Sequence, residues 1–212
     1  RSGRTAEAVR VIAAAKTKSI EVLEEAMAAG ITDFGENYVQ EAEAKIAAIG
    51  PRARWHMIGH LQRNKAKRAA ELFDVVHTVH SAALGRALDR HAAARGIVLP
   101  VLIEVNIGGE ASKDGVAPEA TARLVDDLGS CAALSIAGLM AIPPPGSDAE
   151  SARPFFRRTR ELLEGTRASA PANAPLTELS MGMSGDFAVA IEEGATMVRI
   201  GRALLGERPP RD

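Results

Sequence analysis

Three stretches of the sequence carry side chains whose types and spacing suit chemistry. Lys16 directly follows an apolar run at residues 9–15, which Arg10 alone interrupts. A segment with two glycines and two serines, Ser-Met-Gly-Met-Ser-Gly, occupies residues 180–185, and Arg199 sits in an apolar stretch near the end of the chain. The first stretch offers an amine nucleophile, the second a set of anion donors, and the third a cation that needs a partner.

The position of Lys16 indicates an amine that emerges where a buried strand ends. Its methylene stem would be desolvated there, which favours attack of the free amine on an aldehyde. On position alone, a solvated lysine after a strand is the commoner explanation. Lys18, two residues further on, is the better candidate for that ordinary role.

The glycine-and-serine segment suits a phosphate group. Its glycines let backbone N–H groups such as those of Met181 and Gly182 approach an anion closely, and its two serines, Ser180 and Ser184, add hydroxyl donors. Gly201 and the amide of Arg202 would close the cradle from a second segment. A turn that leads into a helix explains the same pattern equally well, so the segment gains weight from its place in the fold.

Arg199 shares a strand face with Met197 and Gly201 if residues 196–200 alternate. A buried guanidinium needs an acceptor, because an unpaired buried charge is costly. The acceptor is either a ligand beside Gly201 or the carboxylate of Glu104, which also lies in an apolar run. The residues alone leave these two alternatives open.

Other sites are weaker. His56 and His60 flank an expected strand, where the spacing that joins two ligands on a helix does not apply, so we predict no metal site. The sequence contains no Gly-x-Ser-x-Gly elbow and no Walker-type Gly-Lys-Ser/Thr run. The basic stretch at residues 63–68 is most simply a solvated helix face.

Short apolar runs alternate with stretches of helical spacing along the whole chain. Eight such units in 212 residues favour one α/β domain, residues 1–212, that closes as a single (β/α)8 TIM-type barrel. Active sites of such barrels lie on the loops that follow the strands, and phosphate often binds after strands seven and eight. The strands are expected at residues 9–15, 32–34, 54–58, 74–79, 98–106, 134–140, 176–181 and 196–200.

The end of the chain is short for such a barrel. Too few residues follow Gly201 for an eighth full covering helix. A helix upstream of Arg1 would fill that place, so we expect that the N-terminal covering helix is missing from this chain.

The composition limits the classes of partner and compartment. Hydrophobic residues make up 46% and charged residues 25%, as in ordinary globular proteins, and the formal net charge of −1 argues against nucleic acid and anionic membranes. The single cysteine, Cys131, cannot form an internal disulfide and fits a reducing compartment. No apolar run reaches the roughly 18 residues of a membrane span, and no signal-peptide core opens the chain. We therefore expect a cytoplasmic protein.

Taken together, the motifs resemble the pyridoxal 5′-phosphate (PLP) homeostasis, or PLP-binding, protein family, which is related to the fold-type III barrel of alanine racemases. The matching segments occur in family order over nearly the whole chain, and jointly they are highly specific. They are residues 14–18 (Ala-Ala-Lys-Thr-Lys), 34–41 (Phe-Gly-Glu-Asn-Tyr-Val-Gln-Glu), 55–59, 61–62, 105–107, 112–113 (Ser-Lys), 138–140, 179–184 and 198–201.

The resemblance implies roles for individual residues. Lys16 is implied as the Schiff-base lysine, and Asn37 lies near the cofactor. Ser180 and the amides around Met181, Gly182 and Gly201 bind the phosphate, and Arg199 faces the pyridine nitrogen. This chain has Arg202 where a small hydroxyl residue is frequent, so its backbone amide and guanidinium would have to replace that contact.

The resemblance also implies a store or carrier of PLP, and apo forms of PLP-dependent enzymes are its possible recipients. A cation beside the pyridine nitrogen disfavours protonation of the ring and weakens it as an electron sink. Racemases of this fold take a second base from an additional β-domain, which is not present here, and Tyr38 is the sole tyrosine. We therefore expect no catalytic residues and a monomer. A weak PLP-dependent racemase or decarboxylase is the first alternative, and a sugar-phosphate enzyme without PLP is the second.

Overall fold

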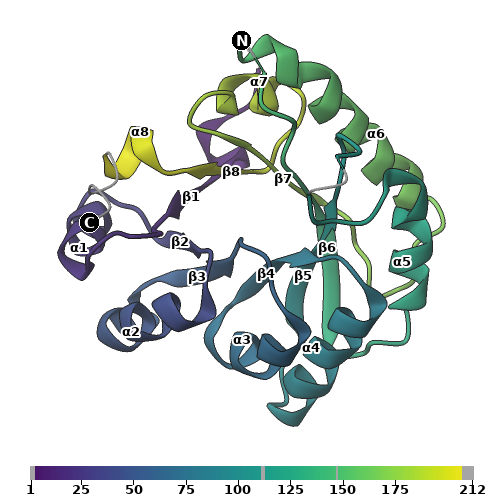
Figure 1. The fold of residues 1–212 in the computed structure, drawn as a ribbon, viewed down its shortest axis with the longest axis horizontal. Coiled ribbons are helices and arrows are strands. Elements are labelled where there is room, and N and C mark those ends of the chain that lie inside the picture. Colours follow the sequence, from purple (N-terminus) through teal and green to yellow (C-terminus); the bar gives the residue numbers. More distant parts are fainter. Residues whose placement is uncertain (1–2, 111–112, 147, 207–212) are drawn as a thin grey trace.

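The computed structural model describes residues 3–110, 113–146 and 148–206. Ser112 of the family motif lies outside these residues. Eight parallel strands form a closed barrel in the order β1-β2-β3-β4-β5-β6-β7-β8, with β8 paired to β1, and helices surround it (Figure 1). The predicted (β/α)8 TIM-type barrel is confirmed.

The strands form where short apolar runs are covered on both faces, as parallel sheets require. In the first half of the barrel they are β1 (Arg10–Ala14), β2 (Asp33–Glu36), β3 (Arg54–Met57) and β4 (Val75–Val79). In the second half they are β5 (Leu99–Val105), β6 (Leu134–Ala141), β7 (Glu178–Met183) and β8 (Met197–Ile200).

The helices follow the strands in turn and place their apolar faces against the barrel. They are α1 (Ile20–Ala28), α2 (Val39–Ile49), α3 (Ala66–Leu72), α4 (Ala82–Ala94), α5 (Thr121–Asp127), α6 (Arg153–Arg167), α7 (Phe187–Glu192) and α8 (Arg202–Leu205). Five 3-10 turns add η1 (Ala6–Ala8), η2 (Gly50–Arg52), η3 (Arg63–Lys65), η4 (Pro118–Ala120) and η5 (Glu150–Ala152). The described part of α8 is a single turn.

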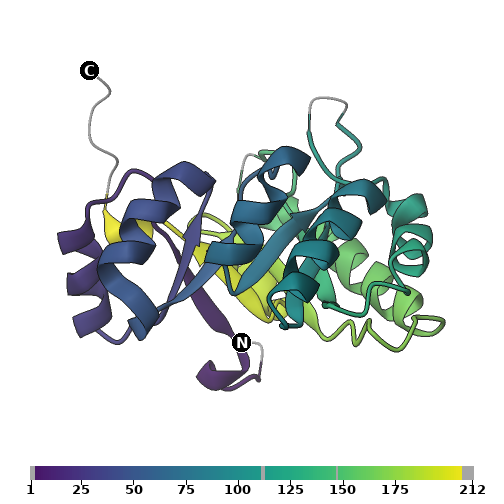
Figure 2. The same ribbon diagram turned by 90° about the horizontal axis from the view of Figure 1, so that it is seen from below.

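The two ends of the barrel differ in what they carry. Figure 2 shows η1 protruding at the end where the strands begin, and Arg4 holds it there by hydrogen bonds to the carbonyl oxygens of Ala8 and Ala195. The residues that follow the strands, including Lys16, Asn37 and Gly201, lie at the opposite end. The sequence places its candidate chemistry at this second end, which we call the mouth.

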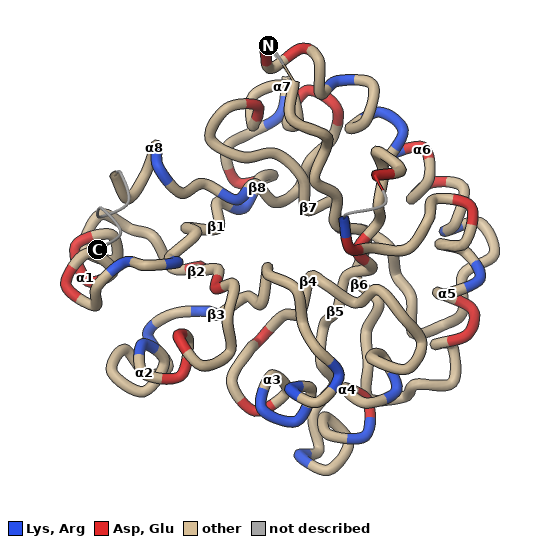
Figure 3. Tube along the Cα trace, viewed as in Figure 1, with Lys and Arg blue, Asp and Glu red and all other residues tan. Residues whose placement is uncertain are grey.

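Hydrophobic burial is concentrated between the strands and the helices. One large cluster there includes Phe34 and Trp55, whose rings lie 5.6 Å apart, and Phe156. A second cluster of buried residues holds three side chains, Val75, Leu102 and Met140. In Figure 3 the charged residues lie mostly on the outer helices, and the strands carry few of them.

Buried polar side chains accompany the small second cluster. They come from five different strands and include Asp33, His56, His77, Ser180 and Arg199, none more than 9% exposed. His77 of β4 and Ser180 of β7 are hydrogen-bonded although their strands are not neighbours, so these side chains meet inside the barrel. The interiors of such barrels are usually filled by branched aliphatic residues. This interior holds polar side chains as well.

Two strand boundaries differ from the prediction, and both matter for the site. β2 runs on to Glu36, because Gly35 and Glu36 continue the pairing with β3. β7 begins later and ends at Met183 rather than at residue 181, because Met183 still pairs with β8. Gly182, which the predicted strand left outside, therefore lies within β7 together with Ser180 and Met181.

Candidate functional site

Lys16 lies at the mouth, two residues after β1 ends. Its side chain is partly exposed, its Nζ atom is 3.5 Å from the Tyr38 hydroxyl, and it sits 4.8 Å from the centre of that ring. Tyr38 itself is 54% exposed. The Lys16 amine is thus reachable from solvent beside one aromatic side chain, as a nucleophile for a small molecule must be.

The backbone beside Lys16 is strained and held in place. Thr17 has φ of 64°, a left-handed conformation that a β-branched residue rarely adopts. Its N–H donates to the Glu41 carboxylate of α2 at 2.6 Å. Glu41 also pairs with Lys45 at 2.9 Å. The sequence analysis missed the part that Glu41 and Lys45 play here, because a glutamate and a lysine four residues apart on a helix look like an ordinary surface pair.

The exits of β7 and β8 come together at the mouth. The Ser184 hydroxyl, just after β7, accepts from the N–H of Ala203 in α8 at 3.4 Å. Gly201 lies against β1, where an added Cβ would meet Ala14 at 3.7 Å. Arg202 is exposed. Glycine and hydroxyl groups from two strand exits therefore face one place, as the phosphate prediction requires.

Gly182 is required for the close approach of β7 to α7. Its φ is 93°, and an added Cβ would stand 2.5 Å from the Ala190 Cβ and 3.1 Å from the Phe187 Cα. The Asp186 side chain precedes α7 but makes no cap hydrogen bond to it, and it accepts from the N–H of Met183 at 2.6 Å. That carboxylate therefore holds the loop after β7 and not the helix.

Ser180 and Met181 do not lie where the sequence suggested. Both are fully buried in β7; the Met181 side chain joins the large core, and the Ser180 hydroxyl is engaged by His77 and Arg199. In this structure the Ser180 hydroxyl is thus engaged inside the barrel, and its contact with phosphate stays a prediction. Ser184, the second serine of the segment, lies at the mouth.

Arg199 is 4% exposed and has no carboxylate partner among the described residues. Its Nη1 donates to the backbone and side-chain oxygens of Ser180 at 2.7 Å, and its Nη2 donates to Ala141 O at 3.0 Å. Burial lowers the pKa of Arg199 to about 10, so it remains a cation at neutral pH. The alternative salt bridge with Glu104 is absent from the described contacts.

A cavity of about 280 Å³ opens at the mouth. Asn37 lines it together with Ile58, Gly59 and Glu104. Burial, with help from the charge of Asp114, raises the pKa of Glu104 to about 7. The cavity thus offers an amide, a half-titrated carboxyl group and apolar surface beside the exits of β2, β3 and β5.

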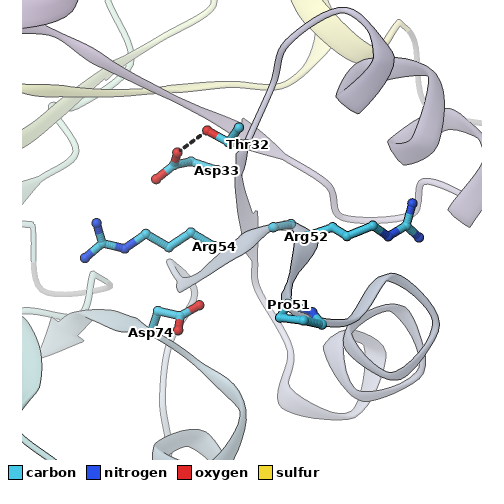
Figure 4. A pocket seen from close by; sticks show the side chains of 7 residues that line it. Thr32, Asp33, Pro51, Arg52, Arg54 and Asp74 are labelled. Carbon is cyan, nitrogen blue, oxygen red and sulfur yellow. Dashed lines mark hydrogen bonds between the residues drawn. The ribbon is translucent and has the colours of Figure 1, made fainter.

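A larger recess, about 580 Å³, lies at the other end of the barrel (Figure 4). Its lining is polar and comes from the starts of β2, β3 and β4, with Asp33, Arg54 and Asp74 among its residues. No side chain of the predicted site lines it. Its size therefore does not make it the better candidate, because the candidate chemistry lies at the mouth.

Two further features bear on the class of the protein. Among the described residues, no group of three or more potential ligands is placed to hold a metal ion. His60 instead pairs with Asp114 at 3.0 Å and stacks on His80. Within the described ranges, the helices are too short or too polar to cross a bilayer.

Comparison with known proteins places the chain in a family. Residues 3–209 match the family model described as alanine racemase, N-terminal domain. Proteins named pyridoxal phosphate homeostasis protein from Vibrio alginolyticus and Aquifex aeolicus are each 42% identical, over 97% and 98% of this chain and 89% and 91% of their own lengths.

Solved structures agree with this placement. PipY of Synechococcus elongatus, solved with PLP bound, has a TM-score of 0.89 at 39% identity and covers 97% of this chain and 96% of its own. Alanine racemase of Clostridium difficile shares the fold, with a TM-score of 0.72 at 13% identity over 98% of this chain and 55% of its own. The chain belongs to the pyridoxal phosphate homeostasis protein family, within the alanine racemase N-terminal domain fold.

Proposed function

We propose that this chain binds PLP as a Schiff base on Lys16 and serves in PLP homeostasis as a reservoir, carrier or chaperone. The observation that carries the proposal is the accessible Lys16 amine at the same barrel end as the joined exits of β7 and β8. The relatives' names and the PLP-bound PipY supply the cofactor class.

The residues present fit such a ligand. Gly182, Ser184 and Gly201, with the amides of Arg202 and Ala203, would hold the phosphate, and Asn37 would contact the ring from the cavity. Arg199 keeps its Nε–H and one Nη2 hydrogen without a described partner, which suits an acceptor such as a pyridine nitrogen. PLP supplies an aldehyde when bound.

The covalent step needs no further reactant. The unprotonated Lys16 amine would attack the aldehyde carbon that PLP supplies, so that a C=N bond would form and the aldehyde oxygen would leave as one molecule of water. Tyr38, 3.5 Å from Nζ, can hold a proton at that nitrogen or at the departing oxygen. Hydrolysis reverses the step and returns free PLP, as a carrier requires.

The same geometry favours storage over turnover. Racemisation needs two bases on opposite faces of the substrate, but the Tyr38 hydroxyl and the Lys16 amine lie together. A cationic Arg199 beside the ring nitrogen would disfavour its protonation and weaken electron withdrawal by the ring. A weak racemase or decarboxylase is the alternative.

The proposal includes the setting in which the chain works. We expect a cytoplasmic monomer that gives PLP to apo forms of PLP-dependent enzymes and binds neither nucleic acid nor membrane. The composition supports this setting, since the net charge is near zero.

An absorbance spectrum tests the proposal directly. The purified protein mixed with PLP is expected to show a visible band that borohydride removes while fixing one PLP per chain. Lys16→Ala is expected to lose both. Lys18→Ala is the matched control, because it removes a neighbouring lysine of the same loop and is expected to keep both.

Three outcomes would contradict the proposal. A Lys16→Ala protein that still traps PLP with borohydride would move the attachment site elsewhere. Steady conversion of any amino acid by the loaded protein, lost in Lys16→Ala, would favour the enzyme alternative. Protein that binds no PLP but binds a sugar phosphate would favour the second alternative, a sugar-phosphate enzyme without PLP.

A further inference from the structure

A continuous chain of hydrogen bonds crosses the interior of the barrel. The Asp33 Oδ1 atom lies 2.9 Å from His56 Nε2, and His56 Nδ1 lies 2.9 Å from His77 Nε2. His77 Nδ1 lies 2.9 Å from the Ser180 hydroxyl, which accepts from Arg199 at 2.7 Å. The chain joins a buried carboxylate at one end of the barrel to a buried guanidinium near the other.

The two ends of this chain have fixed hydrogen-bonding roles. Arg199 can only donate, because a guanidinium has no acceptor. Burial raises the pKa of Asp33, but hydrogen bonds from His56 and Thr32, together with the positive charge of Arg10, outweigh it and leave the pKa below its usual value. Asp33 is therefore ionised at neutral pH and can only accept.

The roles in the middle follow from the ends. Burial lowers the pKa of His56 despite the opposing effect of Asp33, and it lowers that of His77 well below the usual value, so both rings are neutral. His56 must carry its proton on Nε2 to donate to Asp33, and its bare Nδ1 must accept from His77. His77 then carries its proton on Nε2, and its Nδ1 accepts from Ser180.

Every donor in the chain consequently points the same way, from Arg199 through Ser180, His77 and His56 to Asp33. We propose that these four residues are positioning residues for Arg199, and that their one-way chain fixes its guanidinium as a cation whose remote counter-ion is Asp33. The proposal deepens the function above and rests on it, because Arg199 is taken to meet the ring nitrogen of PLP.

The consequence for the ligand concerns the protonation of its ring. With Nη1 occupied by Ser180 and one Nη2 hydrogen by Ala141, the remaining donors of Arg199 can serve only an acceptor. A protonated pyridine nitrogen is a donor and is repelled. The hydrogen-bond chain therefore favours PLP whose pyridine nitrogen is unprotonated, which is the form suited to storage.

Charged groups around the chain come from several strands. Arg10 of β1 lies 3.4 Å from Asp33 Oδ1, and Arg54 of β3 acts on both histidines. Glu104 and Asp186 act on Arg199 from β5 and from the loop before α7. Asp33 itself lines the recess at the far end, beside Thr32 (Figure 4).

The first test needs no cofactor and no variant. Histidine-selective ¹⁵N labelling resolves the five imidazoles, and the ¹⁵N shifts report the tautomer of each. His56 and His77 are both expected as neutral rings protonated on Nε2 at pH 7. A ring protonated on Nδ1, or on both nitrogens, would overturn the one-way chain whatever the protein binds.

The second test uses two carboxylates of the same recess. Asp33→Asn removes the remote counter-ion. Asp74→Asn removes an equal charge, but Asp74 accepts from the backbone N–H of Trp55 and is not part of the hydrogen-bond chain. Asp33→Asn is expected to change the imidazole shifts of both histidines and to weaken PLP binding about tenfold, as for one lost charge-assisted hydrogen bond. Asp74→Asn is expected to leave both unchanged.

The outcomes separate this proposal from the proposed function. Wild-type protein that binds no PLP refutes the proposed function, while the tautomers still decide the polarity of the chain. Normal PLP binding by folded Asp33→Asn would refute the positioning role alone. If Asp33→Asn does not fold, Ser180→Ala cuts the chain at the Arg199 end and is expected to weaken PLP binding; unchanged binding there would sink the proposal.

Discussion

The Nζ atom of Lys45 lies 2.8 Å from the carbonyl oxygen of Ala15, the residue before Lys16. The same ammonium pairs with Glu36 at 2.7 Å and with Glu41 at 2.9 Å. Glu41 in turn accepts from the N–H of Thr17, the residue after Lys16. One buried ion cluster on β2 and α2 thus holds the peptide groups on both sides of the candidate nucleophile.

Lys45→Met is expected to destabilise the fold by about 3–5 kcal/mol, because it leaves the buried Glu36 charge without its partner. Urea unfolding measures the change. The exposed Lys67→Met serves as the control and is expected to change stability by less than about 0.5 kcal/mol. Equal stability of the two variants would mean that the cluster does not hold the Lys16 loop.

The pKa of Glu104 near 7 predicts a pH dependence of stability. Because the folded protein holds this proton more tightly than the unfolded chain, stability is greatest below the ordinary glutamate pKa. It falls as pH rises from there through 7, by up to about 3 kcal/mol. Glu36, whose pKa burial also raises to about 7, contributes a slope of the same sign.

Glu104→Gln is expected to remove its share of that slope. In the PLP-free protein the variant should be more stable than the wild type at pH 8 and equally stable near pH 4. Urea unfolding over this range measures the slope, with the exposed Glu25→Gln as the control. A slope unchanged by Glu104→Gln would contradict the assignment.

Gly182→Ala is expected to destabilise the protein by about 2 kcal/mol or more, since it combines a positive φ with a 2.5 Å approach to Ala190. Gly185→Ala is the matched control three residues on, where an added Cβ meets nothing within 4 Å and φ is not positive. Thermal unfolding of the two variants compares them. Equal melting temperatures would mean that β7 can move away from α7 at little cost.

Ser184→Ala is expected to weaken PLP binding about tenfold by removing one hydroxyl donor to a charged phosphate. Ser130→Ala, an exposed serine in the turn after α5, is expected to bind PLP normally. Titration by absorbance measures both. If Ser184→Ala bound PLP with full affinity, the phosphate would be held by backbone amides without the Ser184 hydroxyl.

The sequence supports the barrel strongly because each of the eight strands is a short apolar run beside a helical stretch. Local capping supports the helices in the same way, as Ser81 caps α4 by accepting from the N–H of Leu84. The end of β7 was wrong because two glycines and two serines look like a loop, although pairing with β8 holds Met183 in the strand. Ser180 was placed at the mouth for that reason.

The polar interior could not be predicted from local patterns. His56 and His77 lie 21 residues apart, and Ser180 a further 103, so only closure of the barrel brings them together. Each of the three lies in an apolar run, where the local pattern shows no partner for it. His56 was considered only as one of two weak metal candidates, and Ser180 only as a phosphate donor. The expectation that an N-terminal covering helix is missing stays a prediction.

The fold has two layers of buried side chains with different roles, an outer shell between the strands and the helices and the lumen of the barrel. Aliphatic and aromatic side chains between strands and helices supply nearly all the apolar burial, while the lumen holds a three-residue apolar cluster beside its hydrogen bonds. Substitutions that change thermal stability can therefore accumulate in the outer shell and leave the electrostatics of the lumen unchanged.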